Sequence, residues 1–500
     1  MLEEQEPWSS EELAQLSPRC TDAANADAVV SRHGDGFRFV HEWAKWIAWD
    51  GRRWSEREAH SKVLRVCLLV AREEYVACSV RIEELRKELF VAQRKDPDKA
   101  KELEQQIQAL QVLAKWHTQS QNITRLHACA AVLATMLGMS LDQLDAHPWL
   151  LNVANGTVDL RTAELRDHAR DDYLTQISSV EWDDTATCPR WELFLEQVML
   201  GDRYTVLYLQ RAIGYSLTGT TEEQCLFFCY GGGSNGKSTF LNVVKSVLGE
   251  YACAAPRDLL MVQKAPKHET EYARLLGKRL ATGAEVGDGQ RFDEAKVKDL
   301  TGSDVIPARR MNEDFWDLTP THKLWLAGNY RPTITGSDEG IWRRVRLIPW
   351  LASITGADVD RELPLKLRAE LPGILRWAVM GCLEWQRHGL GEPTAVLEAT
   401  ETYRKESDVL GQFLSDCCVV EPTGRVSQQT LRERYERWCG EAGVEAMGGR
   451  RIDERLKRLA CAKVTVRDGE LTRKGWRGVR LKTTLELASS SEPGSGNDLS

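Results

Sequence analysis

Residues 225–240 are the stretch that most constrains how this chain can fold. An apolar run is followed by Gly-Gly-Gly-Ser-Asn-Gly-Lys-Ser-Thr, in which Gly231 and Gly236 enclose four residues and Lys237-Ser238 follow. This is the G-x-x-x-x-G-K-[ST] pattern of a phosphate-binding loop. Apolar residues then recur at helical spacing as far as Gly249, which can end a helix. The pattern predicts a buried strand, a loop and a helix, and this context disfavours a glycine turn without a ligand.

The residue types in this loop suit a nucleotide. Glycines adopt positive φ and let backbone N–H groups close around phosphate oxygens, while the helix start contributes its dipole. Lys237 is predicted to reach the β- and γ-phosphates and Ser238 to bind Mg²⁺. ATP and Mg²⁺ are the predicted cofactors. The predicted nucleotide-binding residues are Gly231, Gly232, Gly233, Ser234, Asn235, Gly236, Lys237, Ser238 and Thr239.

Composition excludes several classes of protein. The chain has no apolar stretch of membrane-spanning length, and its acidic start does not resemble a secretory signal. Its 13 cysteines include no C-x-x-C pair, so free thiols in a reducing cytoplasm are expected. The net charge is −8, yet residues 424–482 hold 16 Lys and Arg against 8 Asp and Glu. This distribution predicts a basic nucleic-acid-binding module on an acidic body.

The fold class predicted is multidomain α/β. We expect a poorly ordered N-terminus (1–31), a mixed α+β domain (32–200), an ATPase core (201–400), a C-terminal module (401–484) and a disordered tail (485–500). Within the second segment, aromatic alternation with a turn at Asp50-Gly51 predicts a β-hairpin, whose tryptophans suit a small core better than base stacking. A helical hairpin is expected to break at Asp96-Pro97, and Asn155-Gly156 marks another β-hairpin. A further strand pair is expected to end near residues 180–182.

Two polar residues follow later strands of the core. Glu285 ends the strand expected at 279–285, and Asn329 ends the one expected at 323–329. Parallel strands point their carboxyl ends at the nucleotide, so Glu285 can orient Mg²⁺ or the attacking water and Asn329 can sense the γ-phosphate. Arginines further along can stabilise the transition state, often from a neighbouring subunit.

The last module is expected to contain two helices and a hairpin, the order of a winged helix. Its second helix carries Arg455, Lys457 and Arg458, which are predicted DNA contacts. A winged helix that contacts protein instead is the alternative.

With these motifs, the chain resembles the helicase half of the phage/plasmid primase family, which includes the poxvirus primase–helicase. The resemblance rests on the loop 231–239, on Thr301-Gly302-Ser303-Asp304 with Ala308-Arg309, on residues 323–329 with Pro332, and on Trp342-Arg343-Arg344. It runs from about residue 37 to 481. It implies a superfamily 3 helicase with an AAA+-like core and a ring assembly, most often a hexamer, in the cytoplasm of a bacterial host. The residues implied are Asn329 as sensor, Arg343 or Arg344 as the arginine finger, and Arg309, Arg310 and Lys298 as DNA contacts.

Two departures from the family pattern stand out. The strand before Glu285 is weakly apolar and ends in one acid rather than an acidic pair. No set of catalytic acids for primer synthesis precedes Trp43, so primase activity is not expected in this chain.

The predicted function is therefore ATP-dependent unwinding of DNA during phage or plasmid replication by a ring-shaped oligomer, with a separate primase or polymerase as a further partner. The alternative is an ATP-gated replication initiator or DNA-binding regulator that does not unwind processively. A small-molecule kinase is disfavoured, because it needs neither a winged helix nor a late arginine pair.

Overall fold

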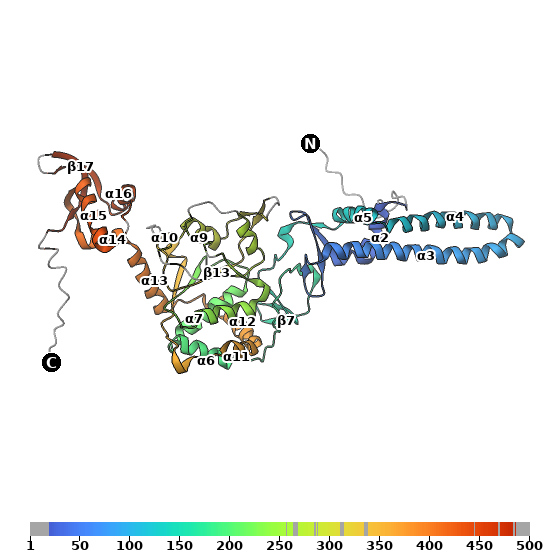
Figure 1. The fold of residues 1–500 in the computed structure, drawn as a ribbon, viewed down its shortest axis with the longest axis horizontal. Coiled ribbons are helices and arrows are strands. Elements are labelled where there is room, and N and C mark those ends of the chain that lie inside the picture. Colours follow the sequence, from blue (N-terminus) through green and yellow to red (C-terminus); the bar gives the residue numbers. More distant parts are fainter. Residues whose placement is uncertain are drawn as a thin grey trace.

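The computed structural model describes residues 20–256, 258–263, 269–284, 287, 289–310, 315–334, 339–444, 446–468, 471–483 and 486. Glu285, most of the predicted N-terminal segment and nearly all of the predicted tail lie outside these residues. Figure 1 shows a central body, with a long helical hairpin projecting from one end and a small module at the other. Within the described residues, no helix is both long and apolar enough to cross a bilayer.

The N-terminal part combines a small sheet with helices. The sheet has the order β3-β2-β1-β4, and only β1 and β4 are parallel. Three of the four clustered tryptophans, Trp43, Trp46 and Trp54, are buried, which confirms that the cluster is largely core. The strands are β1 (Phe37–Val40), β2 (Lys45–Trp49), β3 (Trp54–Ser55) and β4 (Gly138–Met139), and the helices are α2 (Asp22–His33), α3 (Ala59–Lys95), α4 (Pro97–Ser120) and α5 (Ile123–Met136).

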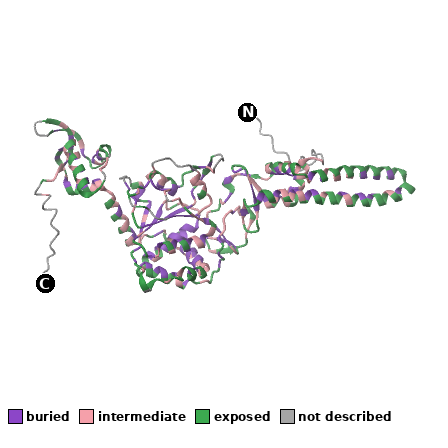
Figure 2. Cartoon of the chain, viewed as in Figure 1, coloured by how far each residue is buried: buried purple, intermediate pink, exposed green. Residues whose placement is uncertain are grey.

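The projecting hairpin consists of α3 and α4. It breaks where the sequence predicts, because Asp96 caps α4 by accepting a hydrogen bond from the Lys99 N–H and Pro97 occupies the first turn. A narrow apolar seam joins the two helices, and their outer faces are exposed (Figure 2). The helix α2 corrects one expectation. Residues 22–31 are helical rather than poorly ordered, since Ala26 and Val29 are buried against the neighbouring helices.

The central body is built on a five-stranded parallel sheet with the order β14-β8-β13-β10-β9. Residues of β8 alternate between two cores: Phe227 and Cys229 face one, and Leu226 and Phe228 face the other. A strand buried on both faces reads as a continuous apolar run, as it does here. The strands are β8 (Leu226–Tyr230), β9 (Ala252–Ala254), β10 (Leu280–Ala284), β13 (Lys323–Gly328) and β14 (Val345–Pro349).

Helices cover both faces of this sheet (Figure 1). One core contains residues of α6, α7, α8 and α12, and the other contains residues of α9 and of the hairpin β11–β12 together with Trp43, Ile47 and Trp54 of the N-terminal sheet. The N-terminal sheet therefore shares a core with the parallel sheet. The elements are α6 (Pro189–Val198), α7 (Arg203–Leu217), α8 (Lys237–Leu248), α9 (Glu294–Thr301), β11 (Ile306–Ala308), β12 (Trp316–Leu318), α10 (Glu339–Trp342), α11 (Leu363–Ala369), α12 (Leu371–His388) and α13 (Thr394–Ser407).

A third small sheet lies between these parts. It consists of β5 (Leu150–Val153), β6 (Gly156–Asp159) and β7 (Glu164–Arg166), and the predicted turn at Asn155-Gly156 is confirmed. The strand pair expected to end near residue 182 is wrong, because no strand is assigned between β7 and α6, all of whose residues are described. Side chains of this segment instead fill the larger core, as Val180 and Trp182 do.

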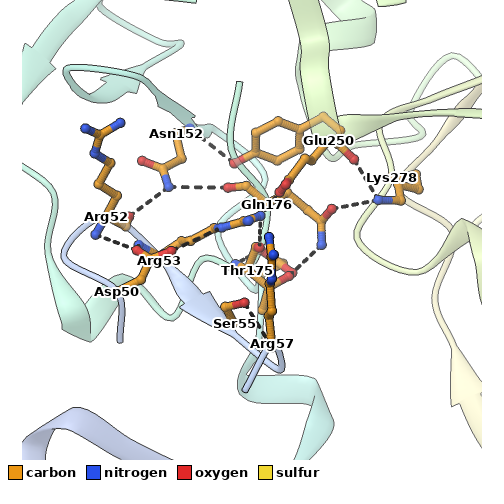
Figure 3. Close-up of polar contacts among 12 residues, drawn as sticks. Asp50, Arg52, Arg53, Ser55, Arg57, Asn152, Thr175, Gln176, Glu250 and Lys278 are labelled. Carbon is orange, nitrogen blue, oxygen red and sulfur yellow. Dashed lines mark hydrogen bonds and ion pairs between the residues drawn. The ribbon is translucent and has the colours of Figure 1, made fainter. Parts of the chain in front are cut away.

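Polar contacts also join the N-terminal part to the body (Figure 3). Asn152 Nδ2 donates to the Arg52 carbonyl at 2.9 Å, and Arg53 forms an ion pair with Glu250. Lys278 Nζ donates to Gln176 Oε1 at 2.7 Å. Such cross-links add specific geometry to the shared apolar core.

The C-terminal module has its own core and follows α13 directly. Its three strands form an antiparallel sheet with the order β15-β17-β16. The elements are α14 (Val409–Cys417), β15 (Cys418–Ser427), α15 (Gln428–Ala442), α16 (Gly449–Arg458), β16 (Ala462–Asp468) and β17 (Leu471–Leu481). All 13 cysteines of the chain are described and free, as expected.

Candidate functional site

The glycine-rich loop 231–236 connects β8 to α8 in the way the sequence predicts. Gly236 has φ +86°, and a Cβ there would lie 2.8 Å from Val198 Cγ1. Gly231 is nearly extended, but a Cβ on it would lie 2.0 Å from the Trp350 carbonyl oxygen. Both positions therefore require glycine. Gly236 requires it because of its backbone conformation and its neighbours, and Gly231 because of its neighbours alone.

Lys237 is buried beneath this loop. Its Nζ donates to the carbonyl oxygens of Gly231 and Gly232 at 2.8 and 2.7 Å, to Asn235 Oδ1 at 2.9 Å and to Asn329 Oδ1 at 3.2 Å. Burial lowers the pKa of the Lys237 ammonium below its ordinary value. The loop thus wraps around a buried cation.

Asn235 fastens the loop to the next strand of the sheet. Its Nδ2 donates to the Trp350 carbonyl at 2.9 Å, directly after β14, and its side chain is buried. The Ile354 N–H donates to the Ser234 carbonyl at 2.7 Å. The loop is therefore held from below by Lys237 and from the side by the segment after β14.

The exposed rim of the loop suits an anion. Gly232, Gly233, Ser234 and Ser238 are exposed. No described atom lies within 4 Å of a Cβ built on Gly232 or Gly233, and no described side chain caps the N–H groups that open α8. A ligand with phosphate oxygens fits this exposed rim, because the N–H groups that open α8 have no side-chain cap there. Ser238 lies in the first turn of α8, where its hydroxyl could join a metal ion bound to such a ligand.

Asn329, one of the two predicted strand-end residues, lies at the same edge of the sheet as the glycine loop. Gly328 pairs with Tyr230, so Asn329 is adjacent to the loop, as its contact with Lys237 shows. Ala284 pairs with Ala327, which brings the end of β10 to this edge as well. Glu285 itself lies outside the described residues. Among the described residues, no group of three or more His, Cys, Asp or Glu could hold a metal ion by itself.

The arginine pair lies at the opposite edge. Arg343 and Arg344 precede β14, which runs parallel to β8, so they lie at the amino edge of the sheet. Arg344 is 8% exposed, and it donates to the Gly340 carbonyl at 2.8 Å and to Gln224 Oε1 at 3.2 Å. Arg343 is exposed and lines a groove of about 860 Å³ together with Lys298. The structure thus presents Arg343, rather than Arg344, to solvent.

The predicted DNA contacts of the β11–β12 hairpin are engaged within the chain. Arg310 forms a two-pronged ion pair with Glu56, at 2.7 and 3.2 Å, and its guanidinium lies 4.6 Å from the ring centre of Trp43. Arg309 lies 4.7 Å from the ring centre of Phe315. A DNA contact by Arg310 would require the bond to Glu56 to break.

The three basic residues predicted on the last module lie on α16. Lys457 and Arg458 are exposed. Arg455 Nη2 instead donates to Asp408 Oδ2 at 2.7 Å, at the junction of α13 and α14. This helix is therefore tied, by one of its own basic residues, to the junction between the central body and the C-terminal module.

Sequence reasoning missed Arg331 and Tyr403, which connect these elements. The Arg331 guanidinium lies 4.8 Å from the ring centre of Tyr230, the residue that precedes the glycine loop, and 5.5 Å from that of Tyr403 on α13. No local pattern marks either residue, because the contact joins three separate elements. The only signal was the position of Arg331 two residues after Asn329.

Comparison with known proteins supports a specific relationship. Residues 26–200 match the family described as "D5 N terminal like", and residues 229–344 match a family of unknown function (DUF5906). A protein of Acanthamoeba polyphaga mimivirus named "Putative helicase" is 27% identical over 328 residues, which are 60% of this chain and 34% of that protein. The chain is related to the primase–helicase family.

Two further relatives are also named as a putative helicase and a putative primase. A "Putative helicase" of Invertebrate iridescent virus 6 is 22% identical over 82% of this chain and 49% of its own length. A "Putative primase" of African swine fever virus is 25% identical over 41% of this chain and 22% of its own length. The chain therefore spans half or less of each relative's length. These relatives come from eukaryotic viruses, whereas the sequence-based expectation was a phage or plasmid in a bacterial host.

A solved structure, the C-terminal region of NrS-1, aligns with a TM-score of 0.39 and 11% identity over 59% of this chain and 77% of that one. This likeness is too weak to establish a shared fold.

Proposed function

We propose that this protein is an ATP-dependent DNA helicase that acts in replication. The observation that carries the proposal is the convergence of the glycine loop, Lys237 and Asn329 at the carboxyl edge of a parallel sheet. Ligands of such sheets bind outside the carboxyl ends of the strands, beside the point where the strand order reverses. Here β8 lies at that point, between β13 and β14, although both follow it much later in the chain.

The residues of the loop have separate tasks in this proposal. The N–H groups of residues 232–238 bind phosphate oxygens, and the Lys237 ammonium exchanges carbonyl partners for phosphate, which is the stronger acceptor because it is charged. Ser238 and Glu285 hold Mg²⁺, which neutralises charge on the phosphates when bound. The Asn329 Nδ2 donates to the γ-phosphate while Oδ1 accepts from Lys237, and Asn329 thereby reports whether that phosphate is present.

The position of Arg343 supports the proposal of a ring assembly. The five residues of β14 separate it from the carboxyl edge, a span of roughly 16 Å at about 3.3 Å per residue. Arg343 cannot therefore serve the loop of its own subunit, but it is exposed and can serve a neighbour's. An arginine supplied in this way stabilises the transition state for phosphoryl transfer. We propose an AAA+-like core of the superfamily 3 type and a closed ring, with six subunits as the expected number.

The C-terminal module supports DNA binding. Its order of helix, strand, two helices and a β-hairpin is that expected of a winged helix, with α16 as the second of the paired helices. Lys457 and Arg458 project from α16 into solvent. We propose that this module binds DNA through phosphate contacts, and that the protein acts in replication together with a separate primase or polymerase. Relatives named as a putative helicase and a putative primase support a role on DNA.

An ATP-gated initiator is the second candidate, favoured by the same module. Such a protein would bind ATP and DNA without displacing a strand. DNA-stimulated ATP hydrolysis would distinguish a motor protein from a protein whose bound nucleotide has only a structural role. We expect wild-type protein to hydrolyse ATP faster with single-stranded DNA and Lys237→Ala to be inactive. Lys245→Ala, on the last turn of the same helix, is the matched control and should retain activity. Equal turnover in Lys237→Ala would contradict the proposed site.

A further inference from the structure

Helix α13 contacts both segments that carry predicted catalytic residues. Its Tyr403 is 2% exposed, and the hydroxyl donates to the Pro332 carbonyl, three residues after Asn329. The Tyr403 ring also packs edge-on against Trp342, the neighbour of Arg343, with ring centres 5.2 Å apart. One side chain of α13 therefore touches the carboxyl-edge loop and the amino-edge arginine segment together.

Arg331 completes the first of these contacts. Its guanidinium lies between the rings of Tyr230 and Tyr403, and it forms an ion pair with Glu406 of α13. Tyr230 is the last residue of β8 and directly precedes Gly231. A shift of Tyr230, or of the segment that carries Asn329 and Arg331, would therefore change the packing of Arg331 against α13.

A third contact links α13 to the basic helix. Asp408, directly after α13, accepts from the Gly411 N–H at 2.9 Å and from Arg455 of α16 at 2.7 Å. It caps α14 and binds α16 at once. The described contacts thus form an unbroken series from the glycine loop, through Arg331 and α13, to the helix that carries Lys457 and Arg458.

Two further polar contacts join α13 to the body. Arg404 forms an ion pair with Glu339 at 3.0 Å, and the Leu347 N–H donates to Thr400 Oγ1 at 3.1 Å. A helix fixed at several points moves as a unit, so it can convey a displacement at one end to the other.

We propose that Arg331 is a positioning residue that couples the glycine loop to the C-terminal basic helix through α13. This inference rests on the proposed function, because it assigns the two coupled ligands as nucleotide and single-stranded DNA. A planar guanidinium stacks between two rings while it pairs with a carboxylate, which an ammonium cannot do as well. The coupling is reciprocal: nucleotide alters DNA affinity by the same factor as DNA alters nucleotide affinity.

The test measures affinity rather than turnover. We would determine the Kd of a labelled oligothymidylate with and without β,γ-imido ATP, for wild type, Arg331→Ala, Glu406→Gln and Tyr403→Phe. Glu398→Gln, which changes an exposed carboxylate of the same helix, is the matched control. Wild type and control should show a nucleotide-dependent change of about 5- to 150-fold. In the other three variants the ratio should fall toward one, while each ligand alone still binds.

The outcomes separate the two proposals. Wild-type protein that binds neither ligand contradicts both the proposed function and this inference. Wild type that binds both without coupling, or variants that keep the wild-type ratio, contradict the inference alone. Tyr403→Phe removes only the hydroxyl, so it keeps the test decisive if Arg331→Ala fails to fold.

Discussion

The Nζ of Lys237 lies 3.2 Å from the Oδ1 of Asn329, although the two residues are 92 positions apart in the chain. The contact exists because β8 and β13 are adjacent and parallel, so the residues that follow them meet at one edge. The amide oxygen of Asn329 accepts one of the hydrogen bonds that the Lys237 ammonium donates. In the proposed function, this pairing holds the Asn329 amide where it can bind the γ-phosphate.

The first prediction concerns Gly236. Gly236→Ala should lower the free energy of unfolding by about 1–2 kcal/mol, because alanine disfavours positive φ and its methyl group would press on Val198 and Phe194. The variant should also lose nucleotide binding. Thermal unfolding and equilibrium binding measure the two effects. Gly233→Ala is the control and should shift stability by less than about 0.5 kcal/mol. An equal loss of unfolding free energy in the two variants would contradict the assigned loop geometry.

The two arginines before β14 should differ in kind. Arg344→Ala should destabilise the fold by about 2–3 kcal/mol, because it leaves the Gly340 carbonyl and the Gln224 amide without their charged partner. Arg343 is exposed, so Arg343→Ala should leave the free energy of unfolding unchanged within about 0.5 kcal/mol. It should abolish ATP turnover, because the proposed function assigns Arg343 to the nucleotide site of a neighbouring subunit. Chemical denaturation measures the change in stability, and ATPase assays measure the change in turnover. Full turnover in Arg343→Ala would exclude it as the trans-acting arginine.

A pH dependence should arise from His322. Its side chain is 2% exposed, neither ring nitrogen has a hydrogen-bond partner among the described residues, and burial lowers its pKa to about 3. Below its unfolded pKa of 6.5 the unfolded chain binds the proton that the folded protein excludes, so stability falls as pH falls from about 6.5 toward 3. The slope is up to about 1.4 kcal/mol for each pH unit.

His322→Phe keeps a ring but removes this titration. The difference in unfolding free energy between variant and wild type should shift in favour of the variant as pH falls from about 6.5 to 4.5. Denaturant unfolding at a series of pH values measures it. Parallel curves for the two proteins would show that the folded protein accommodates the charged ring.

Release of Arg310 from Glu56 should strengthen DNA binding. Glu56 competes with phosphate for this guanidinium, so Glu56→Gln should raise affinity for single-stranded DNA and steepen its salt dependence by about one in the log–log slope. The double variant Glu56→Gln with Arg310→Ala should lose the gain. No difference between the single variant and wild type would place Arg310 away from DNA.

The basic helix should contribute phosphate contacts. Lys457→Ala with Arg458→Ala should reduce the log–log salt slope of DNA binding by about two, uniformly across sequences. Lys99→Ala with Lys101→Ala, two exposed lysines of α4, makes the same charge change far from α16 and should leave the slope unchanged. Fluorescence anisotropy over a salt series measures both. An unchanged slope in the first pair would favour a protein-binding role for the module.

Much of the central fold could be predicted because its signals are local. Apolar runs, glycine turns and capping residues located β8, α8, β13 and the break at Asp96-Pro97. The strand pair near residue 182 was wrong because its alternating apolar residues pack into a core, and its backbone makes separate hydrogen bonds to residues 152 and 154 rather than a strand ladder. Residues 22–31 were expected to be loose because their small apolar side chains give little signal until α3 and α5 cover them.

The contacts that organise the site could not be predicted, because they join distant elements. Burial separates Arg343 from Arg344, and no spacing rule encodes it. Arg279 and Lys323 look like surface cations in the sequence, yet both are buried. They donate to the Leu217 and Thr218 carbonyls, where the negative end of the α7 dipole offsets their charge.

Strand displacement on a forked DNA tests the central claim most directly. Wild-type protein with ATP and Mg²⁺ should release the labelled strand, Lys245→Ala should do the same, and Lys237→Ala should release none. Displacement that depends on ATP and on Lys237 would identify the protein as a helicase. ATP hydrolysis and DNA binding without displacement by the assembled wild-type protein would contradict this, and would identify it instead as an ATP-gated initiator.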